Sequence, residues 1–181
     1  LYLVKYDASG GVEWGQYYPV SGFNATGWDV AEVPAGGYLV TGSIGSSFDN
    51  AAFVVRLNEQ GEQLWANTYK LQSFSGSGVQ VVPLLDGTFA LLQSTALSTA
   101  PSGGPQGAII SRINLDGSVF WSRAATSVED LVTVEFNGFN FSFYGQAEDL
   151  VATPDGNLLF VGGTDIDNSG DVRPALAKIS K

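Results

Sequence analysis

The chain has 181 residues, and its 18 acidic and 8 basic residues give a formal net charge of −10. This charge argues against a nucleic-acid partner and against an anionic membrane surface, because both require a basic face. The sequence contains no Cys and no His, which excludes disulfides and Cys/His zinc sites. Its apolar runs are also too short to predict membrane insertion.

The first predicted element, at residues 1–20, is a β-hairpin whose turn motif occurs three times in the chain. The motif is Asp or Asn, two residues, Gly, three residues and Trp. The Asp or Asn side chain can bond the backbone two residues on, and Gly accepts the positive φ of a tight turn. An apolar run with one basic residue precedes each turn, and a Trp-bearing run follows it. The repeated residues are Gly10 and Trp14, Gly61 and Trp65, and Gly117 and Trp121.

A second pair of strands follows each hairpin. Strand 28–33 is predicted to turn at Pro34 and Gly37 into strand 38–41, and similar pairs are expected within 79–93 and 150–161. Pro at a strand end with Gly shortly after it is typical of turns. The repeating unit is therefore four strands, at roughly 1–43, 51–94 and 107–164, and an extra strand is expected at 174–181.

A four-stranded unit that recurs about every 40 to 50 residues is typical of a β-propeller blade. The sequence thus predicts an all-β protein with three propeller-type antiparallel blades plus one extra strand. Propellers usually close with about four to eight blades. We therefore expect the chain either to be part of a longer propeller or to join other copies of itself through open blade edges.

The combined pattern resembles the repeats of secreted bacterial and archaeal β-propeller proteins. It reads apolar-Lys/Arg-apolar-Asp/Asn-x-x-Gly-x-x-x-Trp, followed by Pro-x-Gly-Gly-Tyr-apolar-apolar-x-Gly. It is more distantly similar to quinoprotein-type blades, although no quinone-site residues accompany the likeness. The resemblance implies an extracellular or cell-surface location. Its motifs specify a blade and name no substrate.

A long insertion within the third repeat carries alternating aromatic residues around Asn137-Gly138. Asn-Gly between alternating runs is a strong hairpin signal, and it pairs Phe136 with Phe139 and Val134 with Phe141. A lone hairpin is barely stable in water. We therefore expect an interface here, formed by Phe136, Phe139, Phe141, Phe143 and Tyr144.

One loop between strands carries oxygen ligands at alternate positions before a Gly, as the start of a calcium loop does. Its residues are Asp165, Asp167, Ser169 and Asp171. Calcium is therefore the one cofactor that the sequence suggests. The match is partial because Leu176 stands where a bidentate acid is expected. The alternative interpretation is a solvated turn.

Three further patterns bear on function. Asn24 and Asn140 fit the N-glycosylation triplet. The aligned residues Lys5, Arg56, Arg112 and Lys178 would either ring a channel or, as we prefer, pack along their strands and reach solvent or an acid. The chain lacks the common general base and the thiol nucleophile, so no enzymatic activity is predicted. The sequence favours an extracellular structural or interaction module, and the alternative is a fragment of a carbohydrate-active or ligand-binding propeller enzyme.

Overall fold

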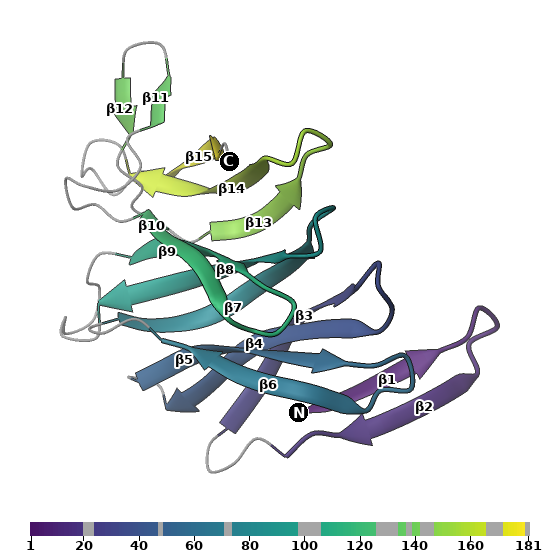
Figure 1. Cartoon of the computed structure of the whole chain (residues 1–181). Helices are drawn as coiled ribbons and strands as arrows, with labels where there is room; N and C mark the ends of the chain where they lie inside the picture. Colours follow the sequence, from purple (N-terminus) through teal and green to yellow (C-terminus); the bar gives the residue numbers. More distant parts are fainter. Residues whose placement is uncertain are drawn as a thin grey trace.

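The computed structural model describes residues 1–19, 24–46, 49–70, 74–97, 106–125, 134–136, 139–141, 147–165 and 172–179. These residues form strands and turns (Figure 1), which confirms the all-β prediction. Within these ranges no helix is present that is long and apolar enough to cross a membrane.

The described strands form antiparallel sheets that follow one another along the chain. The first sheet pairs β1 (Tyr2–Tyr6) with β2 (Val12–Tyr17). The first four-stranded sheet contains β3 (Asn24–Glu32), β4 (Tyr38–Ser46), β5 (Asp49–Leu57) and β6 (Gln63–Tyr69). The second contains β7 (Phe74–Pro83), β8 (Phe89–Leu97), β9 (Gln106–Ile113) and β10 (Val119–Ala125). The last described sheet contains β13 (Ala147–Ala152), β14 (Leu158–Asp165) and β15 (Val172–Ile179).

The inserted hairpin forms with the predicted register. Strand β11 (Val134–Phe136) pairs with β12 (Phe139–Phe141), so that Phe136 lies opposite Phe139 and Val134 opposite Phe141. The interface expected on this hairpin concerns side chains that lie outside the described ones. The expected strand at 174–181 corresponds to β15, which pairs with β14 along its length.

The hydrogen-bonded sheets are offset from the predicted repeat boundaries. Each four-stranded sheet combines the hairpin that turns after Val33 or Pro83 with the Gly-to-Trp hairpin that follows it in sequence. The pairing of β4 with β5 extends from Tyr38 opposite Leu57 to Ser46 opposite Asp49. The order of strands along the chain predicts the hairpins, but it does not predict which two neighbouring hairpins are hydrogen-bonded into one four-stranded sheet.

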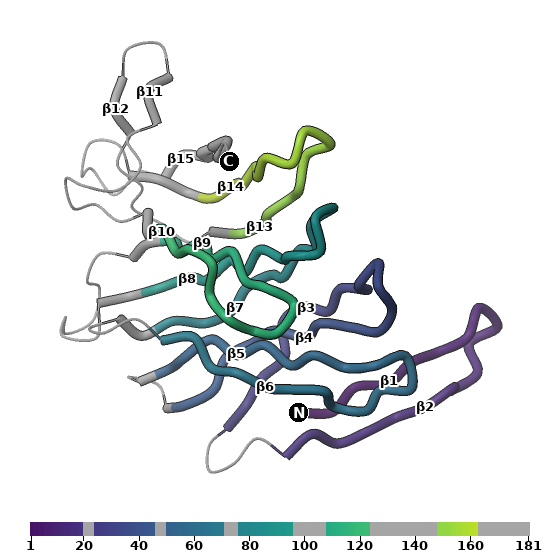
Figure 2. The backbone as a smooth tube through the Cα atoms, viewed as in Figure 1, coloured from purple at the N-terminus to yellow at the C-terminus, as the bar shows by residue number. Residues whose placement is uncertain are grey.

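The sheets lie one after another in a row, face to face (Figures 1 and 2). Because side chains alternate between the two faces of a strand, β5 serves two interfaces. Ala52 and Val54 pack toward the second four-stranded sheet, whereas Phe53, Val55 and Leu57 pack toward β1 and β2. A third cluster joins β8 and β9 to Leu150, Leu158 and Phe160 of the last sheet. The core is therefore divided among the spaces between successive sheets.

Candidate interaction site

The repeated Gly turn has the same backbone in all three copies. Gly10, Gly61 and Gly117 have φ of 85°, 80° and 87°, which is the left-handed region that Gly adopts without steric cost. In the first two copies, as predicted, the first residue of the motif bonds the backbone two residues on, whereas in the third copy Asn114 Nδ2 donates to Ser118 Oγ at 2.9 Å. Asp7 Oδ1 accepts from the N–H of Ser9 at 2.8 Å, and Asn58 Oδ1 accepts from the N–H of Gln60 at 3.0 Å. Hydrogen bonds, chiefly from the Ser9 side chain, hold the pKa of Asp7 below its usual value.

A Trp from the preceding sheet contacts each of the last two turns. The indole N–H of Trp14 donates to the carbonyl oxygen of Glu59 at 3.3 Å, and a Cβ placed on Gly61 would lie 2.9 Å from Cζ3 of the Trp14 ring. Trp65 repeats this geometry, since its indole N–H donates to Leu115 O at 3.0 Å and its ring would lie 3.4 Å from a Cβ on Gly117. At Gly61 the absence of a side chain lets the Trp14 ring approach the turn, whereas at Gly117 the Trp65 ring lies at an ordinary contact distance from the Cβ position.

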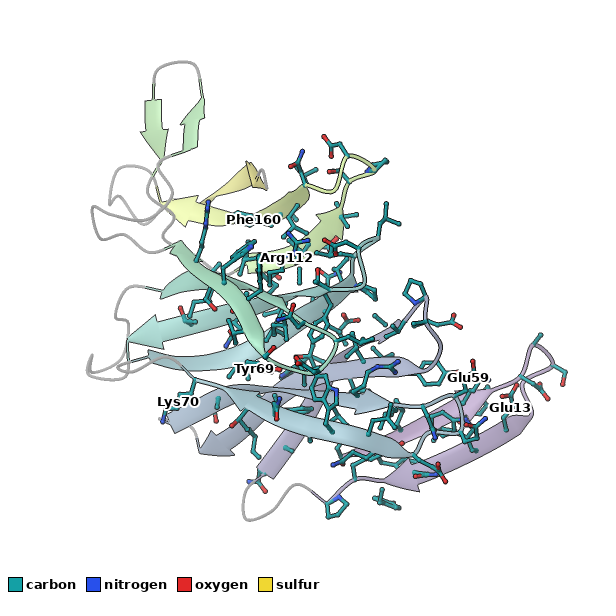
Figure 3. All side chains as sticks on the ribbon, in the orientation of Figure 1. Glu13, Glu59, Tyr69, Lys70, Arg112 and Phe160 are labelled. Atoms are coloured by element: carbon teal, nitrogen blue, oxygen red, sulfur yellow. The ribbon has the colours of Figure 1, made fainter. Side chains whose placement is uncertain are left out.

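A Tyr four residues after each of these Trp residues completes the contact. The hydroxyl of Tyr18 donates to the carbonyl oxygen of Gly61 at 2.6 Å, and that of Tyr69 donates to Gly117 O at 2.9 Å. Figure 3 shows Tyr69 between the two four-stranded sheets. Burial raises the pKa of Tyr18 and raises that of Tyr69 to about 12. We call this arrangement of Trp, Tyr and the Gly turn of the next sheet the clamp.

The sequence analysis singled out the Trp and Gly residues of the clamp but missed both tyrosines. The signal was present, because Trp-x-x-x-Tyr occurs at Trp14 to Tyr18 and again at Trp65 to Tyr69. The third copy departs from it, with Ala125 in the Tyr position. In the described part of the chain, the indole N–H of Trp121 meets no acceptor. Instead, Cζ of Arg123 lies 5.5 Å from the centre of the Trp121 ring.

At the end of the row formed by β1 and β2, the Gly10 turn has no clamp among the described residues. A Cβ on Gly10 would meet nothing within 4 Å. The face of β1 and β2 beside this turn is exposed, with Tyr2 at 52%, Tyr6 at 60% and Tyr17 at 80% exposure. The β5 residues Phe53, Val55 and Leu57 occupy the positions of Tyr2, Val4 and Tyr6, and they are only 2%, 2% and 0% exposed. The open face thus has the chemistry of a sheet interface.

A second set of contacts joins successive sheets at their first strands. Asp29 Oδ2 of β3 accepts a hydrogen bond from the backbone N–H of Val81 in β7 at 2.9 Å, and Gln80 Oε1 accepts from the N–H of Leu150 in β13. In both β3 and β7 the strand register is irregular just before the residue that accepts the bond. In β3 the irregularity lies between Gly27 and Asp29, and in β7 it lies just before Gln80. Such a β-bulge leaves backbone groups unpaired, and the side chain of the preceding sheet satisfies one of them.

The aligned basic residues bind locally. Lys5 Nζ lies 2.6 Å from Glu13 Oε2, and Arg112 pairs with Asp86. Arg56 is buried and donates instead to the carbonyl oxygens of Gly36, Tyr38 and Leu57. Lys5 and Arg112 therefore each reach an acid, which is the interpretation that the sequence analysis preferred to a ring of charges around a channel. Arg56 instead links the preceding turn to its own strand. The side chain of Lys178 lies outside the described ones.

The other predicted sites lie mostly outside the described residues. In the suggested calcium loop, Asp167, Ser169 and Asp171 are beyond them, and Asp165 is described only as the last residue of β14. Of the glycosylation candidates, Asn24 is exposed at the start of β3, and Asn140 lies opposite Glu135 in the inserted hairpin. Phe143 and Tyr144 are not described. Among the described side chains, no group of three or more His, Cys, Asp or Glu is placed to hold a metal.

Two small hollows lie between the turns of neighbouring sheets. One of about 110 Å³ is lined by Pro34 and Leu84, and one of about 200 Å³ by Arg112, Asp86 and Asp155. Small-molecule sites usually measure about 300 to 1,000 Å³. Both hollows are therefore smaller than a usual small-molecule site.

No protein-family model matches this sequence, and none of the curated proteins matches it.

Proposed function

We propose that this chain is an extracellular structural module of propeller-type sheets that joins other copies of itself through the open edge of β1. The proposal rests on the sheet pairing. The propeller arrangement is supported by the repeated four-stranded sheets and by the contacts that recur between them. The extracellular location is supported by the resemblance to repeats of secreted propeller proteins.

The observation that carries the proposal is that, among the described residues, β1 has one strand partner where its counterparts have two, an edge that either a second copy or a preceding segment of a longer chain can fill. Strand β5 lies between β4 and β6, and β9 lies between β8 and β10. In the described residues β1 pairs with β2 only. An exposed edge of this kind is a template for a strand of another chain.

The hydrogen-bond pattern identifies the backbone groups that face the open edge. Leu1 and Tyr18 exchange both of their backbone hydrogen bonds, at 2.9 and 3.4 Å. Such pairs alternate along an antiparallel ladder, so Leu3 and Lys5 also face β2. The N–H groups of Tyr2, Val4 and Tyr6 therefore point away from β2, toward the open edge.

The test compares the self-association of the chain with that of two variants at one position. Val4→Pro removes an outward N–H and blocks the edge, while the β1–β2 ladder keeps its bonds, because Pro is tolerated where the N–H faces solvent. Val4→Thr keeps the N–H and is the matched control. In sedimentation velocity at micromolar concentrations, we expect oligomers for the natural chain and Val4→Thr, and a monomer for Val4→Pro.

A monomer of the natural chain throughout this range would overturn the proposal. Oligomers that persist unchanged in Val4→Pro would show that another surface joins the copies. Hydrolysis of a polysaccharide by the purified chain would favour the alternative, a carbohydrate-active module, over a structural one.

A further inference from the structure

We propose that the apolar hollow between the two four-stranded sheets binds one aliphatic side chain of a basic peptide segment from a partner protein. Two exposed carboxylates, those of Glu59 and Asp116, lie beside this hollow and select the basic residues that flank the aliphatic one. The inference goes beyond the proposed function, because the hollow lies within the row of sheets, away from the edge of β1, and takes a partner of different chemistry.

The hollow lies where the β3–β4 turn of the first four-stranded sheet meets the β7–β8 turn of the second. Both turns are on the same side of the row, to the right in Figure 1. The described residues that line the hollow are all uncharged, and Leu85 and Leu115 among them are exposed. Its buried lining residues are Val33, Leu39, Leu84 and Phe89.

The size of the hollow matches a single apolar side chain. Its volume is about 110 Å³, and an apolar cavity of roughly 150 Å³ admits a group as large as benzene. A hollow of this size therefore has room for one branched aliphatic side chain, although it is too small for most free small molecules.

The equivalent hollow between the second and last sheets has a different chemistry. The turns correspond residue by residue, because the carbonyl oxygens of Val33 and Leu84 each accept a bond from the Gly N–H three positions on. Ala35 therefore corresponds to Asp86, which lines the second hollow together with its ion-pair partner Arg112. An apolar side chain placed there would remove water from both charges at a cost. The first hollow is thus the better site for an aliphatic anchor.

One carboxylate lies beside the wall that the first sheet contributes. Oε1 of Glu59 lies 2.8 Å from the position of a Cβ on Gly36, and Pro34 and Ala35 of the same turn line the hollow. Figure 3 shows Glu59 on the same side of the row as these turns. Arg56 also bonds this turn, at Gly36 O, but only 5% of Arg56 is exposed. The charge that a partner meets here is therefore that of Glu59.

The other carboxylate lies beside the wall that the second sheet contributes. Asp116 is exposed and directly follows Leu115 of the lining. Its Oδ1 accepts bonds from the N–H and the hydroxyl of Ser118 at 2.9 and 2.6 Å. These bonds, chiefly that of the hydroxyl, hold the pKa of Asp116 below its usual value, so the carboxyl is ionised at neutral pH. In the part of the chain that the structure describes, neither Asp116 nor Glu59 pairs with a basic residue.

Charge distinguishes a basic peptide from a second copy of the chain as the occupant. A second copy would bring a net charge of −10 toward the same carboxylates, and like charges repel. Basic residues on the two sides of an aliphatic anchor would instead reach Glu59 beside one wall and Asp116 beside the other. An apolar anchor in a pocket supplies most of the affinity of such an interface, while charges at its rim give specificity.

The experiment measures the binding of fluorescently labelled peptides to the natural chain by anisotropy at physiological salt. The probe peptide has one Leu with two Lys on each side. One control peptide has Ala in place of Leu, and another has Glu in place of every Lys. We expect the Ala peptide to bind about tenfold more weakly, because it lacks most of the apolar surface that the hollow buries. The Glu peptide should not bind.

Variants of the chain locate the site. Leu115→Ala removes an apolar lining residue at a position where the first repeated turn has Ala8, and it should weaken binding of the Leu peptide more than that of the Ala peptide. Glu59→Gln and Asp116→Asn should each weaken the Leu peptide about twofold to fivefold. Glu148→Gln is the matched control, because it removes an exposed charge from the start of β13, away from the turns. Melting curves verify that each variant is folded.

The outcomes are independent of the proposed function. If the natural chain binds the Leu and Ala peptides equally, or binds neither, the hollow does not hold an aliphatic anchor and the inference is wrong. Equal weakening by Glu59→Gln and Glu148→Gln would show that net charge alone attracts the peptide, and would also overturn it. The Val4→Pro variant should bind the Leu peptide as the natural chain does, whether or not the copies associate through β1.

Discussion

The indole N–H of Trp65 donates to the carbonyl oxygen of Leu115 at 3.0 Å, across 50 positions of sequence. This bond joins the last strand of one sheet to a turn of the next. The same contact between Trp14 and Glu59 spans 45 positions. Each sheet therefore depends on its neighbour for part of its stability, as expected of repeat architectures whose units cannot bury their faces alone.

Replacing Trp65 by Phe should destabilise the chain by about 1–2 kcal/mol, because it removes one hydrogen bond and part of a packed ring. Trp121→Phe is the matched control, since among the described residues its indole has no acceptor, and it should cost less than about 1 kcal/mol. Both variants are made in the Val4→Pro background, so that the unfolding of a monomer is measured in urea. Equal losses would contradict the role of the indole N–H.

The Gly turns offer a second matched comparison. Ala at Gly10 or Gly61 must adopt a positive φ, of 85° or 80°, which costs about 1–2 kcal/mol. At Gly61 the added methyl would also lie 2.9 Å from Cζ3 of Trp14, and overpacking adds about 1–3 kcal/mol. In the same monomeric background, Gly61→Ala should therefore lower the free energy of unfolding more than Gly10→Ala. A larger loss for Gly10→Ala would refute this account of the clamp.

Local structure could be predicted from the sequence because its signals are local. The turn at Gly10 follows from Asp7 and Gly within four residues, and its Asp side chain bonds the backbone as expected. The Asn-Gly signal likewise gave the pairing of Phe136 with Phe139. In these cases the residues that determine the conformation lie next to the conformation itself.

Contacts between sheets could not be predicted in the same way. Tyr69 bonds the carbonyl oxygen of Gly117, 48 positions away, and Asp29 bonds Val81, 52 positions away. Their partners are backbone atoms, which every residue carries, so the partner leaves no mark in the sequence. Only the repetition of Trp-x-x-x-Tyr pointed to the tyrosines. Arg56 was also unpredictable, because a buried guanidinium that bonds carbonyl oxygens has the same sequence pattern as one that pairs with an acid.

The suggested calcium loop stays a prediction that a simple measurement can test. If Asp165, Asp167, Ser169 and Asp171 hold calcium, an added chelator should lower the melting temperature, because an ion that binds only the folded chain stabilises it. Asp167→Ala should then melt at the same temperature with and without chelator. Identical melting curves of the natural chain in calcium and in chelator would rule out the site.

The clamp predicts how stability depends on pH in the alkaline range. The hydroxyl of Tyr69 is buried and donates to Gly117 O, and burial raises its pKa to about 12 from an ordinary value of 10.0. The unfolded chain therefore loses this proton at a lower pH than the folded chain does. Its contribution is complete below pH 10 and is lost as the pH rises toward 12.

The expected loss is on the order of 2 kcal/mol in the free energy of unfolding between pH 9 and pH 12, since each pKa unit corresponds to about 1.4 kcal/mol. Urea unfolding of the Val4→Pro monomer at a series of pH values measures it. Tyr69→Phe should be less stable at pH 9, because the bond to Gly117 is lost, but its stability should fall less steeply above pH 10. Tyr17→Phe is the control for the loss of a tyrosine hydroxyl, because Tyr17 is 80% exposed and lies outside the clamp. If Tyr69→Phe and Tyr17→Phe show the same slope, the buried hydroxyl of Tyr69 does not govern the alkaline transition.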